Sequence, residues 1–158
     1  GWITIEHALA AYGVELNKVG QLNGDTTTAR REAMRRERIG ASPSQPLRAP
    51  ASVGVSVLRS SCGGNWCCGS CANVLSASSE NWRTKAIALE TGIADRYKQL
   101  HMNVRSRTED PQVVLVEYYC PACAHALSVD VALSGMQPLP APRRIWSQTS
   151  ASYVAIEA

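Results

Sequence analysis

The sequence predicts an α+β fold in which a small module of β-hairpins carries short helices and extended arms. Two observations lead to this prediction. Cys-x-x-Cys pairs occur twice, as Cys68-Gly-Ser-Cys71 and Cys120-Pro-Ala-Cys123. Residues 113–119 and 127–133, which flank the second pair, are rich in β-branched and aromatic residues, and the later run alternates strictly. A strand, a tight turn and a second strand form a β-hairpin whose turn holds two thiols.

The two cysteine pairs predict a structural metal site. Two residues between cysteines let a tight turn aim both sulfurs at one point, and two such turns make a tetrahedral cage of four thiolates. We therefore expect Zn²⁺ in a zinc-ribbon-like module, with Cys68, Cys71, Cys120 and Cys123 as ligands. Such a closed site leaves no open position for a substrate, which argues for a structural role.

Other uses of the six cysteines remain open. Three disulfides would fit an even count, but the tandem Cys67-Cys68 and the lack of a recognisable signal peptide favour a metal. Iron or redox chemistry is a further alternative. Cys67 could replace Cys68, although only Cys68 repeats the spacing of the second pair, and Cys62 is also spare. His125 could coordinate, but with four cysteines available we expect a hydrogen-bonding surface residue.

Composition limits the size and partners of the protein. The 158 residues allow at most one ordinary domain with appendages. A net charge of +3, with 18% charged residues, argues against an obligatory nucleic-acid partner. Phenylalanine is absent and alanine supplies much of the 45% hydrophobic content, so a metal would help the core to fold. No apolar run is long enough to cross a bilayer, and we expect a cytoplasmic protein without a membrane partner.

Residues 1–40 predict two short helices. The first covers 5–12, with Thr4 as N-cap and Gly13 as its end. The second covers about 28–38, after a turn at Asn23-Gly24-Asp25, and ends at Gly40. Its five arginines could bind nucleic acid, but interleaved glutamates, including a Glu32–Arg36 pair, favour a solvated or subunit-facing helix. The arginines are Arg30, Arg31, Arg35, Arg36 and Arg38.

The remaining chain divides into three predicted parts. Residues 41–52 are expected to be a proline-rich linker, 53–136 the zinc-binding module and 137–158 an extended C-terminal arm. Within the module we expect a strand around Val53, Val55 and Val57, a helix over 80–90 between Ser79 and Gly92, and a weaker helix over 93–100. The arm and the N-terminal segment hold apolar residues without local partners, which favours partner binding. These are Trp2, Leu9, Tyr12, Ile145, Trp146 and Tyr153.

Catalytic motifs are missing from the sequence. It contains no phosphate-binding glycine loop and no recognisable Ser/His/Asp constellation, and the Glu109-Asp110 pair beside Pro111 is typical of a turn. We therefore expect no catalytic and no cofactor-binding residues besides the metal ligands.

Four segments between residues 68 and 133 form a specific pattern: the Cys68/Cys71 pair, Asn81-Trp82-Arg83, the run from Glu117 through Tyr118-Tyr119-Cys120-Pro121-Ala122 to Cys123, and Leu127-Ser128-Val129-Asp130-Val131. In these segments the chain resembles the small zinc-binding subunit of acetone carboxylase and acetophenone carboxylase. Where family members often place glycine after a paired cysteine, this chain has Ala72 and Ala124.

Residues 1–40 carry a second pattern, made of Gly1-Trp2-Ile3-Thr4-Ile5-Glu6-His7-Ala8, Ala11-Tyr12-Gly13-Val14, Asp25, Thr28 and the arginine-rich helix. In these residues the chain is similar to the C-terminal tail of hydantoinase B-type subunits. The two resemblances together imply the end of a hydantoinase B-like polypeptide joined to a zinc module.

What the resemblances imply is a non-catalytic part of an ATP-dependent, biotin-independent complex that carboxylates a carbonyl compound or opens a cyclic amide. Its partners would be large hydantoinase A-like and hydantoinase B-like subunits. Two other classes stay open: a stand-alone zinc ribbon that binds nucleic acid, and a rubredoxin-like electron carrier with iron at the same thiolates.

Overall fold

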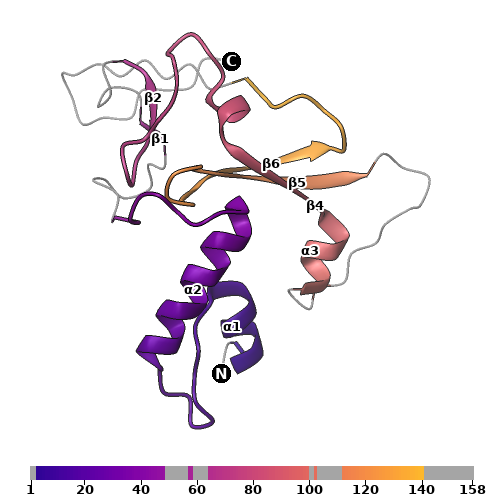
Figure 1. The fold of residues 1–158 in the computed structure, drawn as a ribbon. Coiled ribbons are helices and arrows are strands. Elements are labelled where there is room, and N and C mark those ends of the chain that lie inside the picture. Colours follow the sequence, from indigo (N-terminus) through magenta and orange to yellow (C-terminus); the bar gives the residue numbers. More distant parts are fainter. Residues whose placement is uncertain (1–2, 49–56, 59–63, 100–101, 103–111, 141–158) are drawn as a thin grey trace, which may run out of the picture.

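The computed structural model describes residues 3–48, 57–58, 64–99, 102 and 112–140 (Figure 1). It confirms the α+β fold. In chain order the elements are α1 (Ile5–Tyr12), α2 (Gly24–Ile39), β1 (Val57–Leu58), β2 (Trp66–Cys68), β3 (Val74–Ser76), the 3-10 helix η2 (Trp82–Lys85), β4 (Ile87–Gly92), α3 (Ile93–Gln99), β5 (Val113–Tyr119) and β6 (Ala126–Leu133). In the described part of the chain, no helix is long and apolar enough to cross a membrane.

Two small antiparallel sheets form the body of the described part of the chain. One has the strand order β1-β2-β3 and the other β4-β5-β6. Cys68 ends β2, and Cys120 directly follows β5. Each Cys-x-x-Cys pair therefore lies at the turn of a hairpin, between β2 and β3 or between β5 and β6. Of the strand expected around Val53, Val55 and Val57, only Val57 lies within the described residues, in β1.

The two N-terminal helices lie where the sequence predicts them, but one of them begins earlier than predicted. α1 has the predicted N-cap, since Thr4 accepts a hydrogen bond from the amide of His7, and it ends at Gly13 with φ 60°. α2 ends at Gly40 as predicted, but it begins at Gly24, not at Thr28. Asn23 caps it by accepting from the amide of Thr26. The predicted turn at residues 23–25 is thus the N-terminus of the helix.

The helix predicted over residues 80–90 is wrong. Asn81 caps the single 3-10 turn η2, and the chain then enters β4, which pairs with β5 from Ile87–Tyr119 to Gly92–Val114. Six consecutive cross-strand pairs outweigh the local helical spacing of Trp82, Ala86 and Leu89, because strand formation depends on its partner. The weaker helix expected over 93–100 is confirmed as α3.

The hairpin of β5 and β6 is confirmed, but its buried face is not the more apolar one. Asp130 on β6 is buried, whereas the outward face of the hairpin carries Val113, Val129, Val131 and Leu133 at 39%, 54%, 63% and 41% exposure. We call these four residues the apolar patch. The pairs Val113–Leu133, Leu115–Val131 and Glu117–Val129 place it on one face of the sheet.

The main hydrophobic core is built around the cysteines. It contains Trp66, Leu75, Trp82, Tyr118 and Leu127 together with Cys68, Cys120, Ala122 and Cys123, and Cys71 packs against it. The rings of Trp82 and Tyr118 meet edge to face with centroids 5.8 Å apart. The cysteine cluster is therefore at the centre of the core, so that its state affects the whole module.

Candidate metal centre

The first cysteine pair closes a tight knuckle between β2 and β3. The amide of Cys68 donates to the carbonyl of Asn73, and the amide of Ala72 donates to the carbonyl of Cys68, both at 2.9 Å. The amide of Ser70 points at the sulfur of Cys68, at 3.4 Å. Backbone dipoles within the turn thus face the sulfur and favour its negative form.

The second pair repeats this geometry between β5 and β6. The amide of Cys120 donates to the carbonyl of His125, and the amide of Ala124 donates to the carbonyl of Cys120, again at 2.9 Å. Backbone amides of Ala122 and Cys123 face the Cys120 sulfur. Two turns far apart in sequence therefore adopt one conformation, as expected if both present sulfurs to a common centre.

Alanine occupies the left-handed position of each knuckle. The φ angles are 60° at Ala72 and 57° at Ala124. This region costs a residue with a Cβ atom roughly 1 kcal/mol more than glycine. The departure from glycine therefore leaves the knuckle geometry intact and adds strain to it.

The four predicted cysteines come together. Their Sγ atoms all lie within 4.8 Å of one another, with 3.7 Å between Cys68 and Cys123 and 3.7 Å between Cys71 and Cys120. A tetrahedral zinc site with Zn–S bonds of about 2.3 Å requires sulfur–sulfur distances of about 3.8 Å. These separations are far longer than a disulfide bond of about 2.05 Å. The donor set and spacing thus fit a tetrahedral cation.

The pKa values of the clustered thiols move in opposite directions. Hydrogen bonds with Cys120 and then Cys123 lower the pKa of the Cys68 thiol to about 2. At Cys120 the hydrogen bond with Cys123 acts to lower the pKa, but the bond with Cys68 and burial outweigh it and raise the pKa to about 12. The pKa of Cys123 is also raised, by its bonds with Cys120 and Cys68 and by burial. The thiols of Cys120 and Cys123 thus stay protonated at neutral pH, so that binding of a cation by four thiolates would release protons.

The other candidate ligands lie outside this cluster. Cys67 is buried and takes part in a disulfide, whereas the four clustered cysteines are free. Cys62 lies outside the described residues. His125 contributes its carbonyl to the second knuckle. Its side chain is not the expected hydrogen-bonding surface group, because Nε2 is buried and has no hydrogen-bond partner among the described residues. The cysteines that lie together are therefore the four that the Cys-x-x-Cys spacing predicts as ligands.

Sequence reasoning missed a buried ion pair beside the cluster. Arg83 Nε and Nη2 donate to the two carboxylate oxygens of Asp130, at 2.7 Å and 3.2 Å, and both side chains are 8% exposed. The guanidinium also lies 4.7 Å from the ring centroid of Trp82. Asp130 looked like an ordinary outward residue of an alternating strand, and only the fold brings Arg83 to it.

The segment of Asn81 and Arg83 also holds the start of the C-terminal arm. Asn81 Nδ2 donates to the carbonyl of Leu139 at 2.8 Å, and Arg83 Nη1 donates to that of Pro140 at 3.3 Å. The residues from Met136 to Leu139 run over the sheet and enclose a hollow of about 280 Å³ against β4, β5 and β6. The apolar residues expected to bind partners from 145 onwards lie outside the described residues.

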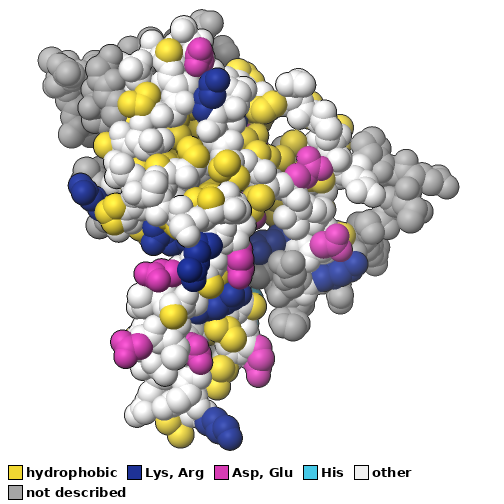
Figure 2. Space-filling view, viewed as in Figure 1, with side chains coloured by type: hydrophobic (Ala, Val, Ile, Leu, Met, Phe, Trp, Pro, Cys, Tyr) yellow, Lys and Arg dark blue, Asp and Glu magenta, His cyan; other side chains and the backbone are white. Residues whose placement is uncertain are grey.

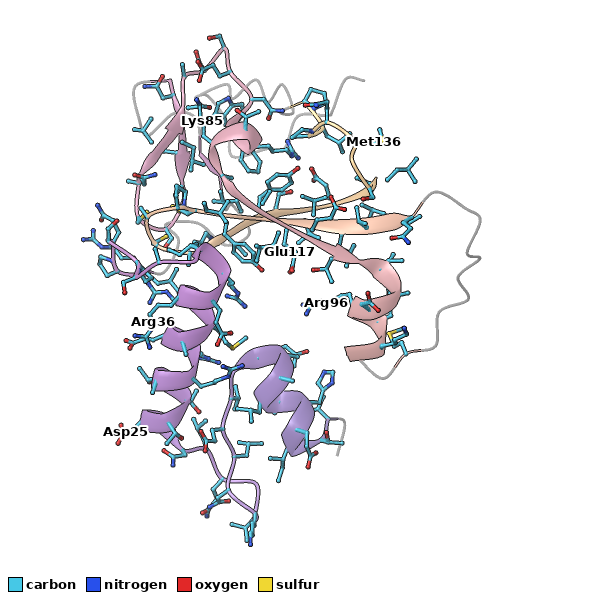
Figure 3. All side chains as sticks on the ribbon, turned by 45° about the vertical axis from the view of Figure 1, so that its right-hand side comes forward. Asp25, Arg36, Lys85, Arg96, Glu117 and Met136 are labelled. Carbon is cyan, nitrogen blue, oxygen red and sulfur yellow. The ribbon has the colours of Figure 1, made fainter. Side chains whose placement is uncertain are left out.

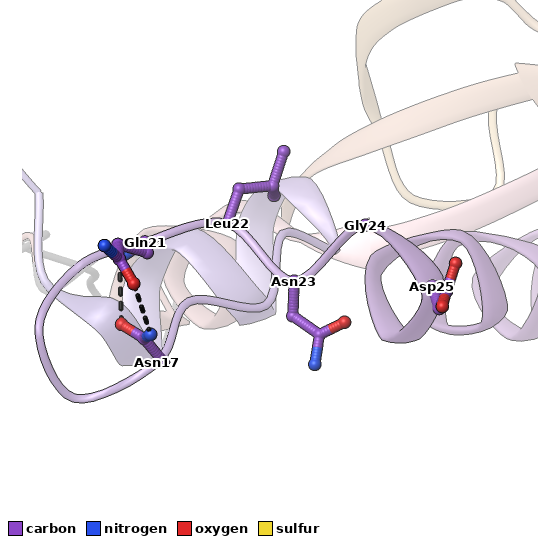
Figure 4. Close-up of a pocket in the computed structure, with 6 residues that line it drawn as sticks. All are labelled: Asn17, Gln21, Leu22, Asn23, Gly24 and Asp25. Atoms are coloured by element: carbon purple, nitrogen blue, oxygen red, sulfur yellow. Dashed lines mark hydrogen bonds between the residues drawn. The ribbon is translucent and has the colours of Figure 1, made fainter.

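A second surface hollow does not resemble an active site. It has a volume of about 340 Å³ and surrounds the turn before α2, where Asn17 and Gln21 bond to each other (Figure 4). Asn23 and Asp25 also line it, and all four polar residues are exposed. Elsewhere on the sheet, Glu117 of β5 and Arg96 of α3 point toward one another at 3.9 Å (Figure 3). These are surface contacts of the fold.

Comparison with known families identifies the module. The family model of the acetone carboxylase gamma subunit matches residues 47–140. The match includes both knuckles, the Arg83–Asp130 pair and the whole β4-β5-β6 sheet, and it leaves α1 and α2 outside. No curated protein and no solved structure matches the chain. Since the family model covers more than half of its residues, the chain belongs to the acetone carboxylase gamma subunit family.

Proposed function

We propose that the chain is a structural, zinc-binding subunit or domain of a multi-subunit, ATP-dependent, biotin-independent complex of the carboxylase or hydantoinase type. The observation that carries this proposal is the cage of four free cysteine sulfurs at the centre of the core, inside the segment that matches the family. Its substrate class would be a carbonyl compound or a cyclic amide, bound by other subunits. We place the complex in the cytoplasm.

The role of the metal follows from the ligand set. Cys68, Cys71, Cys120 and Cys123 would hold Zn²⁺ in a closed site that supplies folding energy and no open coordination position. Each knuckle contributes two sulfurs, so the cation would join the β1-β2-β3 sheet to the β4-β5-β6 sheet. Loss of the metal would separate the two halves of the core.

Exposed apolar surfaces support binding to larger subunits. Three residues of the apolar patch lie on β6, which is an edge strand of its sheet. Proteins usually protect an exposed edge strand with charged residues, whereas the patch is entirely apolar. A second surface on α1 carries Ile5, Leu9 and Tyr12, at 39%, 37% and 57% exposure. Large hydantoinase A-like and B-like subunits would cover these faces, and the resemblance of residues 1–40 to a hydantoinase B tail agrees with such an arrangement.

Catalysis is assigned to the partners. The four grouped cysteines form a closed set, and the two hollows described above lack a nucleophile paired with a base. We expect the purified chain to hydrolyse no ATP and to carboxylate or hydrolyse no substrate by itself. Turnover that persists after removal of every other protein would contradict this assignment.

Affinity purification of the full chain from its native source tests the assembly role. We expect two large subunits of the predicted classes to be retained. Val129→Lys, in the apolar patch, should weaken their retention, whereas Val74→Lys on β3 should not. Both valines are 54% exposed in strands, so the pair differs in place and not in exposure. Equal retention by both variants would remove the patch from the interface, and absence of large subunits would overturn the assembly role.

The identity of the metal distinguishes the proposed structural role from that of a rubredoxin-like electron carrier. Zinc thiolates are colourless, whereas ferric thiolates absorb visible light and would indicate an electron carrier. A colourless chain with stoichiometric zinc supports the structural role, and a red one contradicts it.

A further inference from the structure

The second knuckle also holds the N-terminal helices. Arg35 of α2 donates from Nε to the carbonyl of Cys123 at 3.2 Å, and from Nη2 to the carbonyl of Gln45 at 3.4 Å. Gln45 in turn donates its amide to the carbonyl of Ala122 at 3.0 Å. One guanidinium therefore joins α2, the segment after it and a cysteine of the cluster.

A second arginine adds to this attachment. The guanidinium of Arg38 lies 5.2 Å from the ring centroid of Tyr119, the residue just before Cys120. Tyr119 is 5% exposed, so the base of the knuckle is covered. The space-filling view shows basic side chains gathered where the part formed by α1 and α2 meets the rest of the molecule (Figure 2).

The same face of α2 carries α1. Arg31 Nε donates to the carbonyl of Tyr12 at 3.2 Å. A Cβ atom at Gly13 would lie 2.7 Å from Sδ of Met34, so the glycine allows α1 and α2 to approach closely. Residues 31, 34, 35 and 38 recur at helical spacing and form one stripe. Its first half binds α1, and its second half binds the knuckle.

We propose that Arg35 is a positioning residue of the metal centre and couples metal occupancy to the attachment of α1 and α2. The inference rests on the proposed zinc site. The carbonyl of Cys123 keeps its place only while the knuckle is closed, and the closed knuckle requires all four sulfurs around the cation. When the metal is bound, Arg35 and Arg38 find their partners. The exposed face of α1, with Ile5, Leu9 and Tyr12, is then presented in one orientation.

The coupling acts in both directions, because the free energy shared by two sites is reciprocal. A bound metal holds α2, and a docked α2 slows opening of the second knuckle. Outer-shell partners of metal ligands typically contribute about 10- to 100-fold in metal affinity. We therefore expect Arg35 to affect metal release although it does not touch the metal.

The neighbouring arginine supplies a matched control. Arg36 is exposed and projects from α2 on the side turned away from α1 (Figure 3). Arg35→Gln and Arg36→Gln remove the same charge from the same helix, one residue apart. A difference between them reports the contacts of Arg35 and not the net charge. Arg35→Lys keeps the charge but loses the planar fork, and it serves as a milder variant if Arg35→Gln fails to fold.

The test uses the full chain loaded with zinc. Transfer of zinc to a chromogenic chelator should be about tenfold faster in Arg35→Gln, intermediate in Arg35→Lys and within about twofold of the parent in Arg36→Gln. In the parent and in Arg36→Gln, zinc removal should speed hydrogen exchange of the α2 amides. In Arg35→Gln these amides should already exchange fast with zinc bound.

Two results would overturn the inference. Equal release rates for Arg35→Gln and Arg36→Gln in loaded chains would show that Arg35 does not stabilise the site. Unchanged exchange of α2 on zinc removal would show that the helices are attached independently. A chain that takes up no zinc would overturn the proposed function together with the inference, so the two failures are distinguishable.

Discussion

Ala72 shows how a single residue can store strain beside the cysteine cluster. Its φ of 60° is a conformation that glycine adopts freely, and its side chain is exposed. Ala72→Gly should therefore raise the free energy of unfolding by about 1 kcal/mol. Ala29→Gly, at an exposed position within α2, should lower it by about 1 kcal/mol. Denaturant unfolding of the zinc-loaded chain measures both, and a loss of stability in Ala72→Gly would contradict the strain.

The Arg83–Asp130 pair is the other strong residue-scale effect. Asp130→Asn leaves a buried guanidinium without its charge partner and should destabilise the fold by about 3–5 kcal/mol. Asp95→Asn breaks the pair with Lys98, in which both side chains are more than 70% exposed, and should cost less than about 1 kcal/mol. Thermal unfolding compares the two variants. Similar shifts in both would mean that burial adds nothing to the Arg83–Asp130 pair.

Residues with fixed local roles are the ones that the sequence predicts well. Thr4 and Gly13 bound α1, and the spacing of the four cysteines anticipates their cluster, because capping and tight turns depend on few neighbours. Asp130 could not be predicted as a core residue. Its burial requires Arg83, which lies 47 positions away and arrives only through the pairing of β4, β5 and β6.

At the scale of elements, the predicted start of α2 differs from the start in the structure. Asn23 accepts a hydrogen bond from the amide of Thr26, so the helix begins four residues before the predicted Thr28. Asn23→Ala should lower the free energy of unfolding by about 1 kcal/mol.

Thr28→Ala is the matched change within the helix. It should be neutral or stabilising by up to about 0.5 kcal/mol, because alanine is the better helix former. Thermal unfolding followed by circular dichroism measures both variants. A larger loss of stability in Thr28→Ala than in Asn23→Ala would support a helix that begins at residue 28.

Strand pairing explains the larger error at the same scale. Residues 80–91 contain both a helical spacing, in Trp82, Ala86 and Leu89, and an alternation in Ile87, Leu89 and Thr91. The strand forms because β5 has a free edge that pairs with β4 along its whole length. Local sequence cannot show that edge. The hairpin of β5 and β6 was predictable because its two strands are adjacent and strongly alternating.

At the scale of the whole molecule, the chain is organised from the cysteine cluster outwards. Two hairpins present their knuckles to each other, the aromatic core packs around the sulfurs, and α2 docks on the second knuckle through Arg35 and Arg38. The start of the C-terminal arm is held by Asn81 and Arg83. Long segments with little core of their own thus depend on one small centre, which suits a structural subunit.

The zinc content of two adjacent cysteine variants tests this account most directly. The full parent chain should contain about one zinc per chain by elemental analysis, since four thiolates make one closed site. Cys68→Ser should lose the metal and the cooperative unfolding of the module. Cys67→Ser, one residue earlier, also breaks a disulfide but should keep the zinc because Cys67 lies outside the cluster. Stoichiometric zinc in Cys68→Ser, or its loss in Cys67→Ser alone, would contradict the central claim.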